Sequence, residues 1–149
     1  MARSRHAAVV LDGYIYTYGG TVQQALSSIE RLSVDSNESS WTIFSIEGLS
    51  ARCRAFMCRL NDNEIVVAGG CNTERLSDAI AVNPKTQTVR AIVNQSEFSF
   101  YGRSDQAALS QSGEVFALVR DKDNQLHAMA LDATANTLKS LVCFGKCTN

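Results

Sequence analysis

The sequence predicts an all-β fold made of three four-stranded antiparallel units, and two regularities support this prediction. A strand-like run begins at Gly13, and similar runs begin at Asn63 and Gly113, so the interval is 50 residues each time. The first two runs end in a glycine pair, at Gly19-Gly20 and Gly69-Gly70. A fixed period of this kind is typical of repeat proteins, in which each repeat is one supersecondary unit. We therefore expect a single repeat region over residues 1–149, with units at approximately 3–50, 51–99 and 100–145.

Four short runs make up the first unit. Residues 6–11 are mainly apolar and are followed by Asp12-Gly13, a dipeptide that favours a tight hairpin into residues 14–18. The glycine pair that follows tolerates a positive φ, so the backbone can turn where a side chain would collide. Two further runs, at 28–34 and 41–46, flank a loop rich in Ser, Asn and Asp. These four runs predict four antiparallel strands.

The second and third units repeat this order of runs. In the second unit the third run is halted at Asn83-Pro84, because proline fixes φ and removes a backbone donor. In the third unit Leu118-Val119 stands where the glycine pair is expected, which makes this unit the least regular. No segment requires a long helix. The expected strands are residues 55–60, 64–68, 78–82 and 88–93 in the second unit, and 106–110, 114–119, 125–131 and 137–142 in the third.

The charge of the chain argues against two classes of partner. A net charge of −1 and an isoelectric point near 6.1 predict no basic surface of the kind that nucleic acid or an anionic membrane attracts. Residues 1–6 lead into the first run without the apolar stretch of a signal peptide, and no apolar run reaches the length of about 18 residues of a membrane span. We therefore expect a cytoplasmic protein that binds neither nucleic acid nor membranes.

The cysteines indicate reduced thiols. Five cysteines are an odd number, and they are scattered over unrelated positions of the repeats, unlike a disulfide framework. Cys143 and Cys147 are four residues apart, but no nearby Cys or His pair completes the four ligands of a zinc site. We expect no bound metal.

Three details of the first unit carry a resemblance to a known family. They are the glycine pair after the second strand, Glu30-Arg31 in the third strand, and Trp41 at the start of the fourth after a polar loop. With these features the chain resembles kelch-repeat proteins, whose repeats are about 50 residues long. The similarity extends from about Arg3 to about Val142, although Val89 stands at the tryptophan position of the second unit and the third unit lacks both the pair and the tryptophan.

The resemblance implies that each unit is a blade of a β-propeller, with blades arranged radially around a central channel. It also implies structural roles for the glycine pairs and for Glu30 and Arg31, whose alternating side chains would pair with residues of neighbouring strands. Trp41 is expected to lie with Phe44 on a buried blade face. Kelch propellers commonly have about six blades, and an open arc of three would expose apolar faces. Two alternatives follow: two copies close a six-bladed ring as a homodimer, or the chain is part of a longer propeller.

Arginines precede the first strand of each unit and are the candidate partner-binding residues. A guanidinium fork pairs well with carboxylates, and several forks around one channel would bind an acidic segment. The resemblance implies that arginines at the positions of Arg5 and Arg54 lie near the channel mouth and hold acidic peptide motifs. The alternative is that such arginines bond to loop carbonyls or neighbouring carboxylates. The candidates are Arg3, Arg5, Arg52, Arg54 and Arg103.

The sequence predicts no catalytic residues and no cofactor. Its two histidines, His6 and His127, are far apart in the chain and adjoin no recognisable nucleophile motif. Gly19-Gly20 also lacks the further glycines of a phosphate-binding loop. We expect a non-enzymatic protein-interaction module, either a substrate adaptor or a cytoskeletal scaffold. The alternatives are an enzyme or small-molecule binder that uses the channel, and a structural subunit of a larger assembly.

Overall fold

The computed structural model describes residues 2–34, 40–95, 104–109, 115–120, 123, 125–132 and 136–146. Within these residues the chain forms twelve strands and no helix. Each expected run overlaps one observed strand, so the predicted all-β fold is confirmed. The same residues contain no helix with the length and apolar character that crossing a membrane demands.

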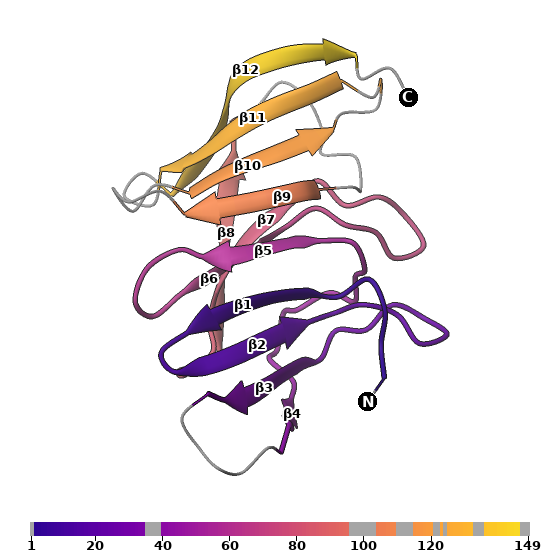
Figure 1. Cartoon of the computed structure of the whole chain (residues 1–149), viewed down its shortest axis with the longest axis vertical. Helices are drawn as coiled ribbons and strands as arrows, with labels where there is room; N and C mark the ends of the chain where they lie inside the picture. Colours follow the sequence, from indigo (N-terminus) through magenta and orange to yellow (C-terminus); the bar gives the residue numbers. More distant parts are fainter. Residues whose placement is uncertain are drawn as a thin grey trace.

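The strands fall into three units of four, which follow one another along the molecule (Figure 1). The first unit contains β1 (Ala7–Leu11), β2 (Tyr14–Tyr18), β3 (Ile29–Ser33) and β4 (Thr42–Phe44). The second contains β5 (Phe56–Arg59), β6 (Ile65–Ala68), β7 (Ala79–Asn83) and β8 (Thr88–Asn94). The third contains β9 (Ser104–Leu109), β10 (Val115–Arg120), β11 (Gln125–Asp132) and β12 (Thr137–Lys146).

The hairpin of the first unit forms as the sequence predicts. Leu11 pairs with Tyr14, so the turn contains only Asp12 and Gly13. Both residues have a positive φ, 48° and 72° respectively. A two-residue turn with this backbone matches the twist of the flanking strands, and Asp-Gly is a preferred sequence for it.

The second and third units differ from the prediction of separate four-stranded sheets. The first unit forms its own sheet in the order β1-β2-β3-β4, but the other two share an eight-stranded sheet in the order β5-β6-β7-β8-β12-β11-β10-β9. They are joined where β8 and β12 pair in parallel, with Val93 opposite Thr137. Asn136, whose φ is 55°, strengthens this junction because its side-chain amide donates to the carbonyl oxygen of Ala91 (2.8 Å) and its own carbonyl oxygen accepts from the N–H of Val93 (3.0 Å).

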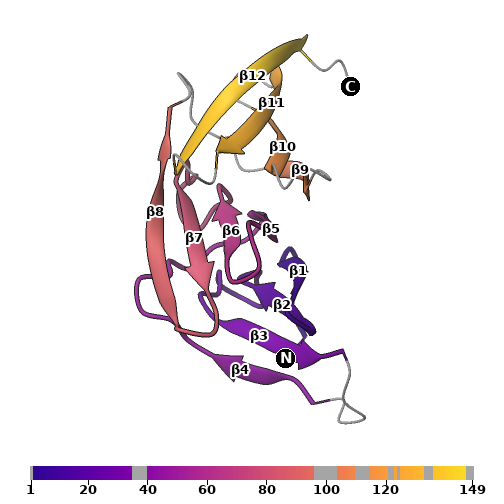
Figure 2. The ribbon, with the colours of Figure 1, turned by 90° about the vertical axis from the view of Figure 1, so that its left-hand side faces the viewer.

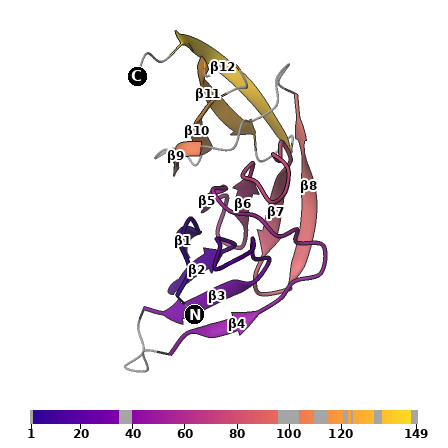
Figure 3. The ribbon, with the colours of Figure 1, turned by 90° about the vertical axis from the view of Figure 1, so that its right-hand side faces the viewer.

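The units form an open arc with the first strands on its inner side. β1, β5 and β9 lie side by side, whereas β4 and β8 lie on the opposite side (Figures 2 and 3). This arrangement brings the loops that follow β2 and β6 close together at one end of the strands. It therefore sets the position of the candidate site.

Two apolar layers hold the units together. Successive side chains of a strand point to opposite faces, so the second unit contributes to both layers. Each fully buried aliphatic side chain stabilises the fold by roughly 1.5–3 kcal/mol. The layer between the first and second units includes Tyr16, Tyr18, Ile29, Met57, Ile65 and Val67. The layer between the second and third units includes Phe56, Val66, Ala81, Val119, Met129 and Leu138.

The outer face of the first unit is open, which corrects one expectation. Phe44 pairs with buried Ile29 and packs against the core, as the sequence predicts. Because side chains alternate, Ile43 points to the other face, and so does Trp41. These two side chains are 54% and 43% exposed, so the prediction of a buried Trp41 is wrong for this chain. The physical reason is that no described unit covers this face.

Candidate functional site

An open groove of about 590 Å³ lies between the ends of the first and second units. Its walls are the loops after β2 and β6, together with the residues that precede β1 and β5. Arg5 and Arg54 contribute the basic side chains of the wall, and Cys53 and Cys71 contribute two thiols. We call this feature the loop groove; the remaining lining residues are Thr21, Gln23, Gln24, Ala25, Ala51, Asn72 and Thr73.

The two loops have the same backbone structure. In the first unit the backbones of Ser4 and Thr21 exchange two hydrogen bonds, of 3.0 and 2.8 Å. In the second unit Cys53 and Cys71 do the same, at 2.8 Å each. The equivalent positions therefore form an isolated antiparallel bridge in each unit. The first and second units therefore contribute equivalent backbone bridges to the wall of the loop groove, with different side chains on each.

The glycine pairs allow these loops to pack closely. Gly20 has a φ of 86°, and a Cβ atom there would lie 2.7 Å from the carbonyl oxygen of Ser4. Gly70 has a φ of 88° and would meet the carbonyl oxygen of Cys53 at the same 2.7 Å. A side chain would therefore collide with backbone at both positions, beyond the strain of the left-handed conformation.

Arg3 and Arg52 are buried beneath the loops and use their donors within the fold. Arg3 donates to the carbonyl oxygen of Gly19 (2.8 Å) and to Oε1 of Glu30 (2.5 Å). Arg52 donates to the carbonyl oxygen of Gly69 (3.1 Å) and to both carboxylate oxygens of Asp78. The side chains of Arg3 and Arg52 are 4% and 1% exposed. Arg3 and Arg52 therefore bond to loop carbonyls and nearby carboxylates, which is the alternative to partner binding that the sequence left open.

Arg5 and Arg54 have a different environment. The backbone N–H of Arg54 donates to the carbonyl oxygen of Arg5 (2.8 Å), so the two units are joined at this point. Both residues are in the left-handed region, with φ values of 57° and 58°, a conformation that costs of order 1 kcal/mol or more outside glycine. Arg5 is exposed and Arg54 is half-buried. Within the described part of the chain neither guanidinium has a hydrogen-bond acceptor or an acidic partner.

The other predicted residues lie away from the loop groove. Arg31 places its guanidinium over the rings of Tyr14 and Phe44, at 5.0 and 5.7 Å from their centroids. Burial raises the pKa of the Tyr16 phenol, and the neighbouring Arg31 guanidinium only partly opposes this effect. Arg31 therefore fastens neighbouring strands of the first unit to one another. Arg103 lies outside the described residues.

Within the described residues the two histidines lie in different units, and no metal-binding cluster is present. His6 is exposed before β1, and His127 is buried in β11 of the third unit. In the same residues, no three side chains of the His, Cys, Asp and Glu types come together as they would around a metal ion. Cys143 is exposed in β12, and Cys147 lies outside the described part of the chain.

One feature of the site was not predicted from the sequence. The Sγ atoms of Cys53 and Cys71 lie 3.4 Å apart. The pKa of the Cys53 thiol is raised, mainly by burial and to a smaller extent by the contact with Cys71. Alignment of the two units would have revealed this pair, because its members occupy the positions of Ser4 and Thr21.

Comparison with known proteins agrees with this architecture. Residues 2–43 match the Kelch motif family model, a segment that includes the first glycine pair, Glu30-Arg31 and Trp41. No curated protein matches the chain. The second unit repeats the strand order and the glycine-pair loop of this matched segment, so the part of the chain that carries the Kelch motif is followed by a unit of the same construction.

Proposed function

We propose that the chain is a protein-interaction module that binds an acidic peptide segment at the loop groove through Arg5 and Arg54. One observation carries this proposal: two arginines from neighbouring units line the same groove, are joined through their backbones, and have no acidic partner among the described residues. Kelch repeats generally serve protein–protein interaction, which agrees with this role.

The chemistry of the groove supports an acidic ligand. A guanidinium presents several donors in a planar fork and pairs with both oxygens of a carboxylate. Buried Arg3 and Arg52 would support this function indirectly, because they hold the carbonyl groups at the base of the two loops. By its position in the repeat, Arg103 would supply a third basic side chain. The finer roles of substrate adaptor or cytoskeletal scaffold in the cytoplasm are extensions of the same proposal.

The open face of the first unit supports a second part of the proposal, closure of the arc. Val10, Trp41 and Ile43 expose apolar surface on that face, and contiguous apolar surface usually marks an interaction site. We propose that another unit covers it. That unit comes either from a second copy, which gives a six-bladed homodimeric ring, or from the remainder of a longer propeller.

Peptide binding tests the role of the arginines. A fluorescent peptide rich in Glu and Asp should bind the wild-type chain more tightly than the corresponding Gln and Asn peptide. The double variant Arg5→Ala/Arg54→Ala should lose at least about tenfold in affinity, because each charged hydrogen bond contributes roughly 1.5–3 kcal/mol.

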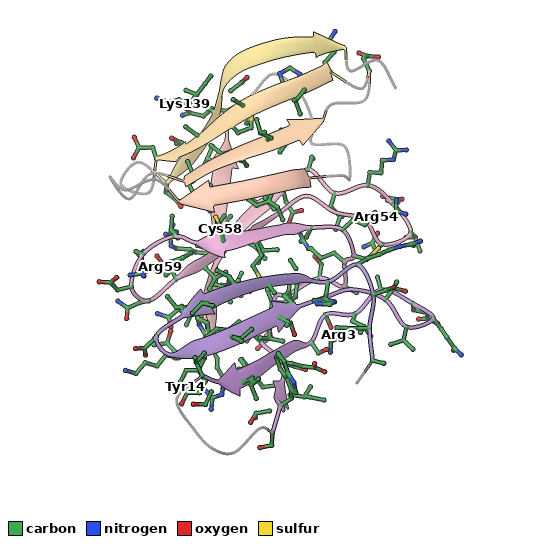
Figure 4. The ribbon with its side chains drawn as sticks, in the orientation of Figure 1. Arg3, Tyr14, Arg54, Cys58, Arg59 and Lys139 are labelled. Atoms are coloured by element: carbon green, nitrogen blue, oxygen red, sulfur yellow. The ribbon has the colours of Figure 1, made fainter. Side chains whose placement is uncertain are left out.

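Arg59→Ala is the matched control. Arg59 is also exposed but lies at the other end of the strands from Arg54 (Figure 4) and pairs with Asp62. Its removal should leave peptide affinity unchanged. Equal binding of the acidic and amide peptides, or an equal loss in both variants, would contradict the proposal.

A further inference from the structure

Cys53 and Cys71 face each other across the bridge that forms one wall of the loop groove. Their backbones exchange two hydrogen bonds of 2.8 Å, which is the arrangement of a hydrogen-bonded antiparallel pair. In such a pair the Cα atoms are about 5.5 Å apart. The Sγ atoms are already within 3.4 Å of each other.

This geometry is compatible with a disulfide. Disulfide-linked residues have Cα separations of about 4.4–6.8 Å and an S–S bond of about 2.05 Å. Bond formation at this position therefore requires a small approach of the two sulfur atoms, with the backbone bridge already in place.

The thiols are not needed to build the loop. Ser4 and Thr21 form the same backbone bridge in the first unit, at 3.0 and 2.8 Å, without any sulfur. The pair is therefore an addition of the second unit. The formation of the loop therefore does not explain why these two positions are cysteines.

Access from the groove distinguishes this pair from Cys58, the other buried thiol among the described residues. Cys53 and Cys71 line the groove, and Cys71 is only half-buried. Arg5 and Arg54 lie near enough to Cys53 to favour its thiolate electrostatically, although burial and Cys71 act in the opposite direction. Cys58 belongs to the core between the second and third units, where burial raises its pKa to about 12. A reagent in the groove therefore meets Cys71 first.

We propose that Cys53 and Cys71 form a reversible disulfide on reaction with a hydroperoxide, so that the wall of the loop groove is a site of redox modification. This inference is independent of the proposed peptide binding.

The reaction balances in two steps. The thiolate of Cys71 attacks one oxygen of hydrogen peroxide, the O–O bond breaks, and a sulfenic acid and hydroxide form. The thiolate of Cys53 then attacks that sulfur, the S–O bond breaks, and the second hydroxide leaves as the S–S bond forms. The two hydroxides take up the two thiol protons to give two water molecules. In sum, two thiols lose two electrons to one peroxide, and a dithiol such as dithiothreitol reverses the oxidation.

Peptide mapping tests the proposal directly on the full chain. Cleavage after Lys and Arg places every cysteine in a different peptide: 53–54, 55–59, 60–75, 140–146 and 147–149. The reduced chain is treated with hydrogen peroxide at low protein concentration, remaining thiols are alkylated, and the digest is analysed by mass spectrometry. We expect a cross-linked product of 53–54 with 60–75 that contains two hydrogen atoms fewer than the separate peptides and disappears after dithiothreitol.

Two variants complete the test. Cys53→Ser/Cys71→Thr gives the second unit the residues of the first, so it should fold with a similar thermal midpoint and retain its remaining thiols under the same peroxide dose. Cys58→Ser should still form the cross-link. The proposal is overturned if the wild-type product is absent, if Cys53 and Cys71 link equally to the other cysteines, or if the double variant loses thiols as fast as the wild type.

Discussion

Arg52 and Asp78 form a bidentate ion pair inside the second unit, with guanidinium nitrogens 3.1 and 2.8 Å from the two carboxylate oxygens. Arg52 is almost fully buried, whereas about half of the Asp78 side chain (48%) is exposed. The carbonyl oxygen of Arg52 also accepts a 2.9 Å hydrogen bond from Gly20 of the first unit. One residue thus joins the base of the second loop to the glycine pair of the first.

Replacing Asp78 with Ala should destabilise the chain through this buried cation. Breaking a buried ion pair costs about 3–5 kcal/mol, and we expect about 2–3 kcal/mol because Asp78 is partly exposed to water. Asp62→Ala is the control, since Asp62 pairs with an exposed arginine and should cost no more than about 1 kcal/mol. Urea denaturation measures both. Similar losses in the two variants would show that Arg52 does not depend on its carboxylate.

Substituting Gly70 with Ala should test the close packing of the loop. Gly48 provides a matched control because its φ of 86° is nearly the same as the 88° of Gly70, while the nearest atom to an added Cβ is 4.0 Å away. Both substitutions carry the cost of the left-handed conformation, about 1–2 kcal/mol. Gly70→Ala should cost a further 1–3 kcal/mol or so from its overlap with the carbonyl oxygen of Cys53. Equal losses in thermal unfolding would contradict this steric explanation.

The repeat made most of the fold predictable. The interval of 50 residues and the Asp12-Gly13 turn identified the strands of the first unit, because hairpins depend on local turn chemistry. The pairing of β8 with β12 was not predictable in this way. It joins the outer strands of two units, and periodicity within a unit contains no information about such a contact.

The candidate site was predictable only in part. The position of the arginines before each first strand identified all four of these candidates. It could not distinguish the buried structural residues Arg3 and Arg52 from Arg5 and Arg54, which line the loop groove. The difference depends on carboxylates more than 20 residues away, Glu30 and Asp78, whose placement follows from strand register. Trp41 shows a related limit: its apolar character predicts a covered position, but the local sequence does not say whether another unit packs on that face, and Trp41 is 43% exposed.

The ion pair between Glu64 and Arg90 should make stability depend on pH. The hydrogen bond from Arg90 lowers the pKa of Glu64 in the folded chain, so the pair stabilises the fold above the unfolded carboxyl pKa of about 4.3. This contribution is lost as the pH falls through the lower folded pKa. Because Arg90 is 39% exposed, we expect at most about 1 kcal/mol. Glu64→Gln should be less stable than the wild type at pH 7, and the difference should shrink as the pH falls below the unfolded carboxyl pKa of about 4.3; a difference independent of pH would contradict this assignment.

Trp41 offers a direct measurement of whether a second copy closes the arc. It is the single tryptophan of the sequence and is 43% exposed in the isolated chain, so its emission should be red-shifted in dilute solution. If two copies close the ring, the emission should move to shorter wavelength as protein concentration rises, in parallel with the mass from sedimentation.

Trp41→Glu should then keep the chain monomeric because a charge on the covered face is costly to bury. Val22→Glu, at an exposed position in the loop after β2, should still associate. A monomer at every concentration would exclude the homodimer and leave a longer propeller as the remaining form of closure.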